Sequence, residues 1–344
     1  MKARIGVLAT TIEGHGGIQR YGHQVCASIE AEGHALVLRE SARWRSTPAR
    51  LAGVAGLASQ LRSCDLLWTL HPRLAVAGGL ASRRADVPHV VSTYGFENWG
   101  KYSWAMRQAL RRADAITAIS AFSAALMGDA GRDAILLRPT WGQVSASPAG
   151  NRAQRERRSI LFVGRLGESY KGVDLVLEVA ARFSGDGLWR FVLAGDGRLS
   201  PDLDAKARRL ANTSVVVAPT DDELNRLYQE AAVVLLPSRA QRLPGNRWVG
   251  GEGFGIVLLE AALAGATVLA SDQGACPETV ALLGNGLVRP PTEDEFEAGL
   301  RLLLADPELR TNLAGLGARS AERLAPEVFQ QKVAGVVALA LQQA

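Results

Sequence analysis

The sequence predicts an α/β protein made of two doubly wound domains, each with a parallel sheet between layers of helices. Short apolar runs rich in β-branched residues alternate with helical patterns along almost the whole chain, which is typical of βα units. A polar stretch interrupts this alternation near the middle. The length of 344 residues also exceeds what one hydrophobic core usually organises. We therefore expect two domains joined by a linker.

In the first half of the chain, short strands are separated by segments with helical periodicity. The apolar segment 51–61 is long enough for one of these helices, and several arginines precede it. A second helical segment, near residue 107, carries arginines at helical spacing. The expected strands are residues 5–9, 35–38, 66–70, 89–92, 115–119 and 135–137.

Residues 140–158 break the pattern because they are small, polar and charged, and we interpret them as a linker. The alternation then resumes, and the chain ends in an apolar-rich helix over 326–344. We predict domains over 1–143 and 144–325, with the final helix packing back on the first domain. The expected strands of the second domain are residues 160–163, 191–193, 215–217, 233–236, 268–270 and 286–288.

Charge is shared unevenly between the two halves. Residues 1–150 hold 17 Lys+Arg and 10 Asp+Glu, whereas residues 151–344 hold 22 and 24. A basic first half suits an anionic partner, such as a lipid surface or a phosphorylated acceptor, although solvated helix faces also carry such arginines. We expect no nucleic-acid partner, because the basic residues lack interleaved aromatics and no nucleic-acid-binding motif is present.

The sequence indicates a cytoplasmic protein. It has no run of about 18 uninterrupted apolar residues, and Met1 leads into a short strand without a signal-peptide pattern. Its three cysteines, Cys26, Cys64 and Cys276, are too few and too scattered for a disulfide framework or a cysteine-based metal site. We expect all three to be small core residues.

In the most informative segment, Glu252 and Glu260 flank a glycine-bearing turn and an apolar run. Gly253 and Gly255 let the backbone approach a ligand, and a helix beginning near Ile256 directs its free amides at anionic or hydroxyl groups. Glu260 then lies about one turn beyond Ile256 on the same side of the helix. We expect both acids to face one ligand site; the alternative is an ordinary solvated helix start.

Two cations follow the first strand of the second domain. Arg165 and Lys171 stand six positions apart before a helix, an arrangement that suits a pyrophosphate whose charge grows as a bond to it breaks. In the first domain, the turn at Gly16 and Gly17 opens a helix and can hold a phosphate. This turn is not a dinucleotide fingerprint, because Gln19 stands where a third glycine is needed.

The motifs GGIQRY, TYGFENWG, RRADAITAIS, VGRL followed by YKG, AGDG, DDELNRLYQEAAVVLLPS and EGFGIVLLEAALAGATVLAS occur in this order over about residues 4–325. Together they resemble the retaining glycosyltransferases of family four, which have the GT-B fold of two Rossmann-like domains facing across a cleft. The resemblance is greatest to mannosyltransferases that act on phosphatidylinositol and to related polysaccharide-assembling enzymes.

The resemblance implies a metal-independent hexosyltransferase without a cofactor. Its donor is a nucleotide diphosphate sugar, GDP-mannose or a UDP-hexose, bound by the second domain. Its acceptor is a hydroxyl of a glycan, glycolipid or lipid-linked molecule, bound by the first domain. Such an enzyme serves cell-surface polysaccharide or glycolipid synthesis, and its basic half places it at the inner membrane face as a peripheral protein.

The resemblance also assigns residues. Glu252 stabilises positive charge at the anomeric carbon of the donor sugar, Arg165 and Lys171 grip the diphosphate, and Glu260 takes the ribose hydroxyls. The remaining donor contacts are assigned to Gly16, Gly17, Val217, Gly253, Phe254, Gly255 and Ile256.

One departure from the family leaves the sugar open. Tyr94 stands where much of the family has a histidine, and it keeps one hydrogen-bond donor. His71 and Arg247 are further candidates for contacts with the sugar or acceptor. The loop 239–251 either closes over the donor, meets an anionic acceptor, or is a solvated insertion. Two alternative functions stay open: a nucleotide-sugar epimerase or hydrolase on the same fold, and a non-catalytic nucleotide-sugar sensor.

Overall fold

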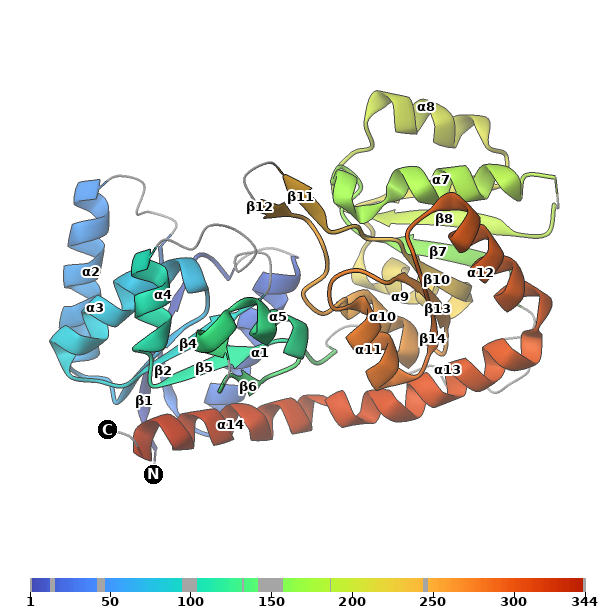
Figure 1. Ribbon diagram of the computed structural model, residues 1–344. Helices are drawn as coiled ribbons and strands as arrows, with labels where there is room; N and C mark the ends of the chain where they lie inside the picture. The colour runs from blue at the N-terminus through green and yellow to red at the C-terminus, as the bar shows by residue number, and fades with distance from the viewer. Residues whose placement is uncertain are drawn as a thin grey trace. The chain divides into compact units, whose positions relative to one another are not determined.

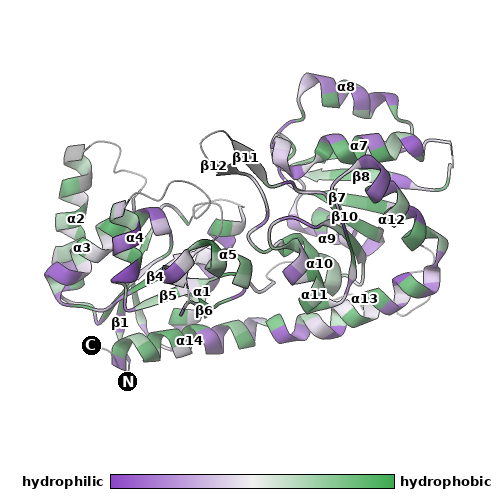
Figure 2. Ribbon diagram, in the orientation of Figure 1, coloured by the Kyte–Doolittle hydropathy of each residue, from purple (hydrophilic) through white to green (hydrophobic). Residues whose placement is uncertain are grey.

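The computed structural model describes residues 2–12, 16–41, 47–94, 104–131, 133–141, 157–185, 187–243 and 247–342. The chain divides into two compact units (Figure 1). Unit 1 comprises Met1–Thr140 and Ala325–Ala344, and unit 2 comprises Trp141–Leu324. Figure 2 shows that hydrophobic residues are concentrated in the strands of each unit.

Unit 1 is built on a six-stranded sheet in the order β2-β1-β3-β4-β5-β6, in which every paired strand is parallel. Its helices form two layers: α2 contacts α3 and α3 contacts α4 on one face, whereas α1 lies on the other. The strands are β1 (Arg4–Ala9), β2 (Ala35–Glu40), β3 (Leu66–Thr69), β4 (His89–Thr93), β5 (Ala115–Ala118) and β6 (Ile135–Leu136). The helices are α1 (Gly17–Ala31), α2 (Thr47–Leu61), α3 (Ala75–Ala85), α4 (Trp104–Arg111), α5 (Ala121–Leu126) and the last helix, α14 (Pro326–Gln342).

The last helix of the chain, α14, packs against α1 within unit 1. The ring of Phe329 meets that of Tyr21 edge-on, with centroids 5.6 Å apart, and Gln330 Nε2 donates to Glu32 Oε1 at 2.8 Å. Val333 and Val337 are also buried. The apolar side of α14 is therefore part of the core of unit 1.

By length and composition alone, the helical run Pro307–Gln342 is long and apolar enough to cross a membrane. This run consists of α13, a short 3-10 turn and α14. The core helices of globular proteins meet the same criteria of length and composition. In α14, many of the apolar residues lie on the side that is buried in unit 1.

Unit 2 repeats the architecture, with a parallel sheet in the order β14-β13-β10-β7-β8-β9. The strands are β7 (Ser159–Val163), β8 (Arg190–Gly195), β9 (Thr213–Val217), β10 (Ala231–Leu236), β13 (Thr267–Ser271) and β14 (Gly286–Arg289). The helices are α7 (Val173–Arg182), α8 (Pro201–Arg209), α9 (Asp221–Glu230), α10 (Ile256–Leu263), α11 (Cys276–Leu283), α12 (Glu293–Ala305) and α13 (Pro307–Ala321).

The structure confirms the predicted fold class and each of the expected strands, whose ends move by no more than two residues. It adds one antiparallel pair, β11 (Gln241–Leu243) and β12 (Arg247–Val249), inside the loop 239–251. The three cysteines are free and buried, as expected.

The predicted linker is wrong at its carboxyl end. Arg157 is buried, and its guanidinium donates to the carbonyls of Ala231, Ala264 and Gly265 at 2.9–3.0 Å. Burial lowers the pKa of Arg157 to about 10, which still leaves it cationic at neutral pH. Residue 157 therefore belongs to the core of unit 2, and residues 142–156 lie outside the described part of the chain.

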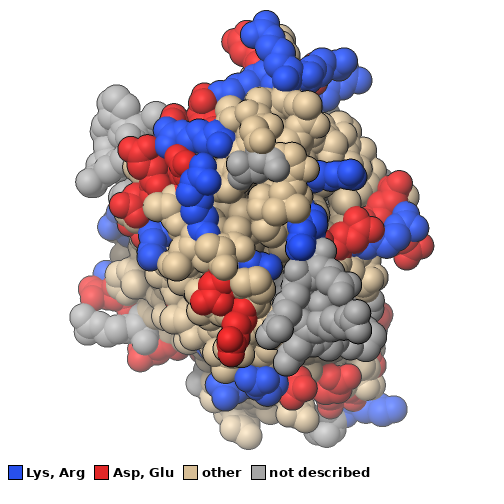
Figure 3. Space-filling model, turned by 90° about the vertical axis from the view of Figure 1, so that its right-hand side faces the viewer, with Lys and Arg blue, Asp and Glu red and all other residues tan. Residues whose placement is uncertain are grey.

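The surface of unit 2 carries mixed charge. On the face that Figure 3 presents, basic and acidic side chains are interspersed. One such group joins Arg182 to Glu293, Asp294 and Glu297 at 2.6–2.8 Å. This mixture agrees with the nearly balanced composition of residues 151–344.

Candidate active site

The candidate site of unit 2 lies in loops that follow the strands of its sheet. Lys171 comes from the loop after β7, and Ser238 comes from the loop after β10. Glu252 precedes α10. Because ligands of open α/β sheets bind beyond the carboxyl ends of the strands, this edge is where a binding site is expected.

Lys171 and Glu252 form a nearly buried ion pair. Lys171 Nζ lies 2.5 Å from Glu252 Oε1, and the two side chains are only 13% and 12% exposed. Ser238 Oγ donates to the same carboxylate oxygen at 2.7 Å. Burial acts to lower the pKa of Lys171, but the Glu252 carboxylate and Tyr170 outweigh it, so the pKa is raised. Lys171 is therefore a fixed cation at neutral pH.

Gly172 brings the Lys171 loop against the loop after β10. Its backbone has a φ of +76°, and a Cβ at this position would lie 2.6 Å from the carbonyl oxygen of Pro237. Only glycine accommodates both the left-handed backbone and this close approach. The contact places Lys171 beside Ser238, the residue after Pro237.

The backbone of Glu252 is held by the loop after β13. Ala275 N donates to Glu252 O at 2.9 Å, and a Cβ at Gly274 would lie 2.7 Å from the same oxygen. Gly274 also has a φ of +65°. The carboxylate of Glu252 is thus presented from a backbone fixed by the loop after β13.

Arg165 and Lys171 share the ring of Tyr170. The Arg165 guanidinium lies 5.9 Å and Lys171 Nζ 5.4 Å from the ring centroid, and Arg165 also donates to the Tyr170 hydroxyl. Arg165 is more exposed than Lys171 and lies 3.4 Å from Glu168. The structure therefore brings the two predicted phosphate-binding cations to one place. Tyr170 was not identified from the sequence, although an aromatic residue directly before the lysine was a usable signal.

Glu260 has a different partner from Glu252. It lies in the second turn of α10 and is buried, and its Oε2 accepts a hydrogen bond from the Tyr228 hydroxyl at 2.6 Å. Tyr228, on α9, was not identified from the sequence. The two acids thus have separate hydrogen-bond partners, and their roles toward a ligand stay a prediction.

The turn before α10 is shaped by its glycines, and the predicted helix start at Ile256 is confirmed. Gly255 has a φ of +83°, and Gly253 and Phe254 are buried. The Phe254 carbonyl accepts from Thr279 Oγ1 at 2.5 Å. The segment enters the helix in one defined conformation, with its amides at the helix N-terminus.

The other predicted donor contacts lie on exposed backbone. Gly16 precedes α1 in an extended conformation, and Gly17 begins the helix. A Cβ at Gly17 would meet nothing within 4 Å, so the described residues leave that position open. Val217, the last residue of β9, is exposed, and Ala218 after it has a φ of +49°.

The side chains of Tyr94 and His71 form hydrogen bonds with the backbone of unit 1. The Tyr94 hydroxyl donates to the carbonyl of Leu70, and His71 Nδ1 accepts from the amide of Arg73 at 3.1 Å. Both side chains are buried. Their contact with a sugar or acceptor stays a prediction. Arg247 lies in β12, but its side chain is outside what the structure describes.

In the described part of the chain, no group of three or more His, Cys, Asp and Glu side chains is placed to hold a metal ion.

Two stretches of the sequence match known families. Residues 145–318 match the family Glycosyl transferases group 1, and residues 24–140 match a Glycosyl transferase 4-like domain. These matches cover most of unit 2 and unit 1, respectively.

Among known relatives, phosphatidyl-myo-inositol mannosyltransferase of Mycolicibacterium smegmatis is 33% identical over 175 residues, which cover 49% of this chain and 41% of the relative. Alpha-D-kanosaminyltransferase of Streptomyces kanamyceticus is 31% identical over 164 residues, which cover 46% of this chain and 39% of the relative. The chain therefore spans less than half the length of either relative.

Two solved structures share the fold. HepE of Anabaena, in complex with UDP, aligns with a TM-score of 0.77 at 18% identity. The alignment covers 97% of this chain and 99% of the HepE chain. Sucrose-phosphate synthase of Thermosynechococcus elongatus aligns with a TM-score of 0.75 at 16% identity, and the alignment covers 99% of this chain and 100% of the synthase chain. With its two parallel six-stranded sheets, this chain has the GT-B fold, and it belongs to the family Glycosyl transferases group 1.

Proposed function

We propose that this protein transfers a hexose from a nucleotide diphosphate sugar to a hydroxyl of a glycan, glycolipid or lipid-linked acceptor, with retention of anomeric configuration. The observation that carries the proposal is the nearly buried pair of Lys171 and Glu252, inside the segment that matches Glycosyl transferases group 1. Similar proteins support it: one relative is a mannosyltransferase, and HepE structures contain UDP and UDP-glucose. The proposed donor is accordingly GDP-mannose or a UDP-hexose.

The pair suits the charges that develop in such a transfer. The bond between the anomeric carbon and the phosphate oxygen breaks, so the diphosphate becomes more negative while the sugar becomes positive. Lys171 and Arg165 stabilise the diphosphate, and Glu252 stabilises the sugar. The acceptor oxygen bonds to the anomeric carbon on the same face, and its proton passes to the departing phosphate.

The rest of the donor is assigned to neighbouring residues. Glu260, which accepts a hydrogen bond from Tyr228, also accepts from the ribose hydroxyls. The backbone at Val217 contacts the base. The amides before α10 contact sugar and phosphate. Gly16 and Gly17 keep a proposed contact with the diphosphate. The proposal uses the two cations in place of a metal ion and needs no cofactor.

The proposed setting is the cytoplasm and the inner membrane face, in the synthesis of cell-surface polysaccharide or glycolipid. The basic composition of residues 1–150 supports attraction to an anionic leaflet.

A donor screen followed by product analysis tests the proposal. Thermal unfolding with UDP, GDP, dTDP and ADP sugars identifies the donor, because a ligand that binds only the folded protein raises its stability. We expect one GDP or UDP sugar to stabilise the protein and to be consumed only when an acceptor is present. Proton NMR of the product should show the donor's anomeric configuration.

Three outcomes would contradict the proposal. An inverted product excludes a retaining transfer. Release of a free or epimerised sugar without acceptor indicates a hydrolase or an epimerase. Stabilisation by a nucleotide sugar without turnover on any acceptor indicates a sensor.

A further inference from the structure

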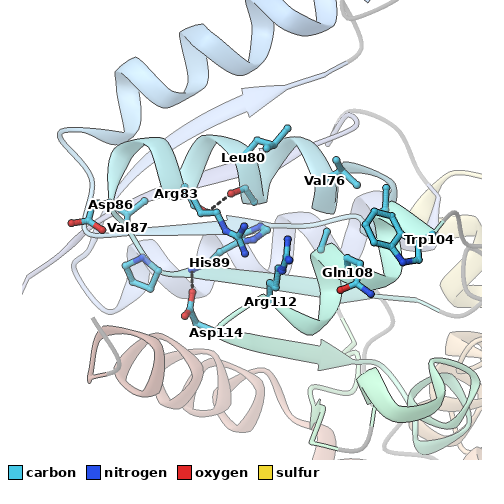
Figure 4. A pocket seen from close by; sticks show the side chains of 15 residues that line it. Val76, Leu80, Arg83, Asp86, Val87, His89, Trp104, Gln108, Arg112 and Asp114 are labelled. Carbon is cyan, nitrogen blue, oxygen red and sulfur yellow. Dashed lines mark hydrogen bonds between the residues drawn. The ribbon is translucent and has the colours of Figure 1, made fainter.

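A second hollow lies in unit 1, away from the carboxyl ends of its strands. It has a volume of about 460 Å³ and lies between α3 and α4 (Figure 4). Its lining includes His89, the first residue of β4, and Asp114, which directly precedes β5. The pocket therefore reaches the amino ends of two strands, and nothing in the proposed transfer uses it.

Two arginines line the pocket from different helices. Arg83 comes from α3, and Arg112 directly follows α4. Both side chains are exposed, and neither forms an ion pair with any residue that the structure describes. Residues 75–85 and 104–112 together contain five arginines and no acidic residue. Two guanidinium groups at one hollow, neither of them held in an ion pair by a described residue, favour an anionic ligand.

The acidic residues of the pocket lie at its end near the strands. Asp114 Oδ2 accepts from the amide of His89 at 2.7 Å, which holds this carboxylate at the amino end of β4. Asp86 ends α3, and Figure 4 shows it at the far end of the pocket from Arg112 and Trp104. The part of the pocket between Arg112 and Trp104, where Gln108 also lies, therefore has no acidic side chain among its described residues.

A buried imidazole nitrogen also opens onto the pocket. His89 is only 3% exposed, and its Nε2 is hydrogen-bonded to Thr69 Oγ1 at 2.8 Å. Its Nδ1 has no hydrogen-bond partner among the described residues. The neighbouring position on α3 is Gly79, where a Cβ would lie 3.6 Å from that nitrogen. Gly79 therefore places no side chain over this nitrogen.

The rim of the pocket is apolar. Trp104 on α4 is 76% exposed and Leu80 on α3 is 59% exposed, and both line the pocket. Leu51, which is 70% exposed, lies on α2 beside α3. These are the three most exposed large hydrophobic side chains in the described part of the chain, and all lie on one layer of helices. Exposed apolar side chains that gather on one layer of helices indicate a surface that contacts a partner or a membrane rather than water.

We propose that this pocket binds the phosphate headgroup of an anionic membrane phospholipid, with Arg83 and Arg112 contacting the phosphate and with Leu80 and Trp104 entering the apolar edge of the bilayer. Tryptophan and leucine beside arginine are the side chains that favour the boundary between headgroups and acyl chains. A soluble phosphate compound uses the arginines alone and leaves the apolar rim without a role. The proposal does not depend on glycosyl transfer.

Vesicle co-sedimentation tests this proposal with matched variants. The vesicles contain either phosphatidylcholine alone or equal parts of phosphatidylcholine and phosphatidylglycerol. The pocket variant is Arg83→Gln/Arg112→Gln, and its control is Arg84→Gln/Arg107→Gln, which removes two exposed arginines of the same helices that do not line the pocket. A third variant, Leu80→Gln/Trp104→Gln, removes the apolar rim, with Leu188→Gln as an exposed control in unit 2.

We expect the wild-type protein to bind only the phosphatidylglycerol vesicles. The pocket variant should lose about thirty-fold in partitioning, because each basic residue at an anionic surface contributes about 1 kcal/mol. The arginine control should lose less than about three-fold, and the rim variant should lose about ten-fold or more. All of the substituted side chains are exposed, so melting temperatures should stay close to that of the wild type.

Several results would overturn the proposal. Equal losses in the two arginine pairs indicate general attraction rather than a pocket. Full binding by the rim variant, together with saturable binding of glycerol 3-phosphate in solution, identifies a soluble phosphate ligand instead. A wild-type protein that ignores anionic vesicles excludes a lipid and leaves a protein partner as the occupant of this face.

Discussion

Lys171 and Glu252 are 81 positions apart in the sequence, yet their charged groups meet at 2.5 Å. The two charges compensate each other, and each side chain is largely shielded from water. A buried charge that loses its partner is costly, so neither group is free to turn away. In the proposed complex, the diphosphate of the donor binds Lys171 and the sugar binds Glu252. Each charged side chain therefore has a partner both before and after the donor binds.

Glu252→Gln and Glu260→Gln should impair different steps. Removing the Glu252 charge should lower the transfer rate about 100- to 1000-fold, because charge stabilisation is lost in the transition state, while nucleotide affinity changes only a few-fold. Glu260→Gln should weaken nucleotide binding about ten-fold, because an acceptor for ribose hydroxyls is lost. Calorimetric titration and transfer kinetics separate the two effects. If both variants lose affinity and rate together, the acids do not have separate roles.

Ser238→Ala should lower turnover without much change in donor KM. The serine donates one of two hydrogen bonds that reach Glu252 Oε1, so its loss lets the carboxylate reorient. One such bond is worth about 1 kcal/mol, which corresponds to a fall of about five-fold in kcat. Ser184→Ala, an exposed serine whose hydroxyl bonds a helix carbonyl, is the control and should leave kcat unchanged. An unaltered kcat in Ser238→Ala would show that this bond does not position Glu252.

Arg157→Met should destabilise unit 2 by about 3 kcal/mol. The substitution removes a cation whose bonds satisfy three backbone carbonyls, and buried acceptors without partners are costly. Arg158→Met is the matched control. Its exposed guanidinium lies 5.5 Å from the centroid of Trp189 and should contribute less than about 1 kcal/mol. Urea unfolding of both variants checks the difference, and equal losses would mean that the buried bonds have no net effect.

His89 should make the folded protein less stable below neutral pH. Burial, and to a smaller extent Arg83, lower its pKa to about 4, compared with 6.5 for an unperturbed histidine. Between these values the unfolded chain binds a proton that the folded protein does not, so stability falls as pH drops from 6.5 to 4. The loss amounts to about 3 kcal/mol.

The measurement for His89 is the free energy of unfolding across this pH range for the wild type and His89→Gln. Subtracting the two curves removes the carboxylates that titrate in the same range. The difference should change by about 3 kcal/mol between pH 7 and pH 4. Parallel curves would show that His89 is protonated as readily in the folded protein as in the unfolded chain.

The sequence was a good guide where local pattern decides structure. Alternating apolar runs located each strand of the two sheets, and the glycines around Phe254 located the start of α10 at Ile256. Placing Arg165, Lys171 and Glu252 in loops at strand ends was enough to expect them together, because a parallel sheet brings such loops to one edge.

The sequence was a poor guide where distant segments decide the environment of a residue. Arg157 stands in a polar stretch, and only the carbonyls of Ala231, Ala264 and Gly265 make its burial possible. Tyr228 and Ser238 were missed because their partners lie 32 and 14 positions away. The pair of β11 and β12 was missed because charged residues hide its alternation, although a Pro-Gly dipeptide at 244–245 is a turn signal.

The packing of α14 on α1 has a consequence for synthesis. The ribosome makes residues 1–140 before unit 2 and α14 after it, so unit 1 is incomplete while all of unit 2 is being made. Until then Tyr21 lacks the ring of Phe329, and the apolar side of α1 is bare. Stop codons in the last twenty positions should therefore harm the part of the molecule that was translated first, and shortened products should require chaperones to stay in solution.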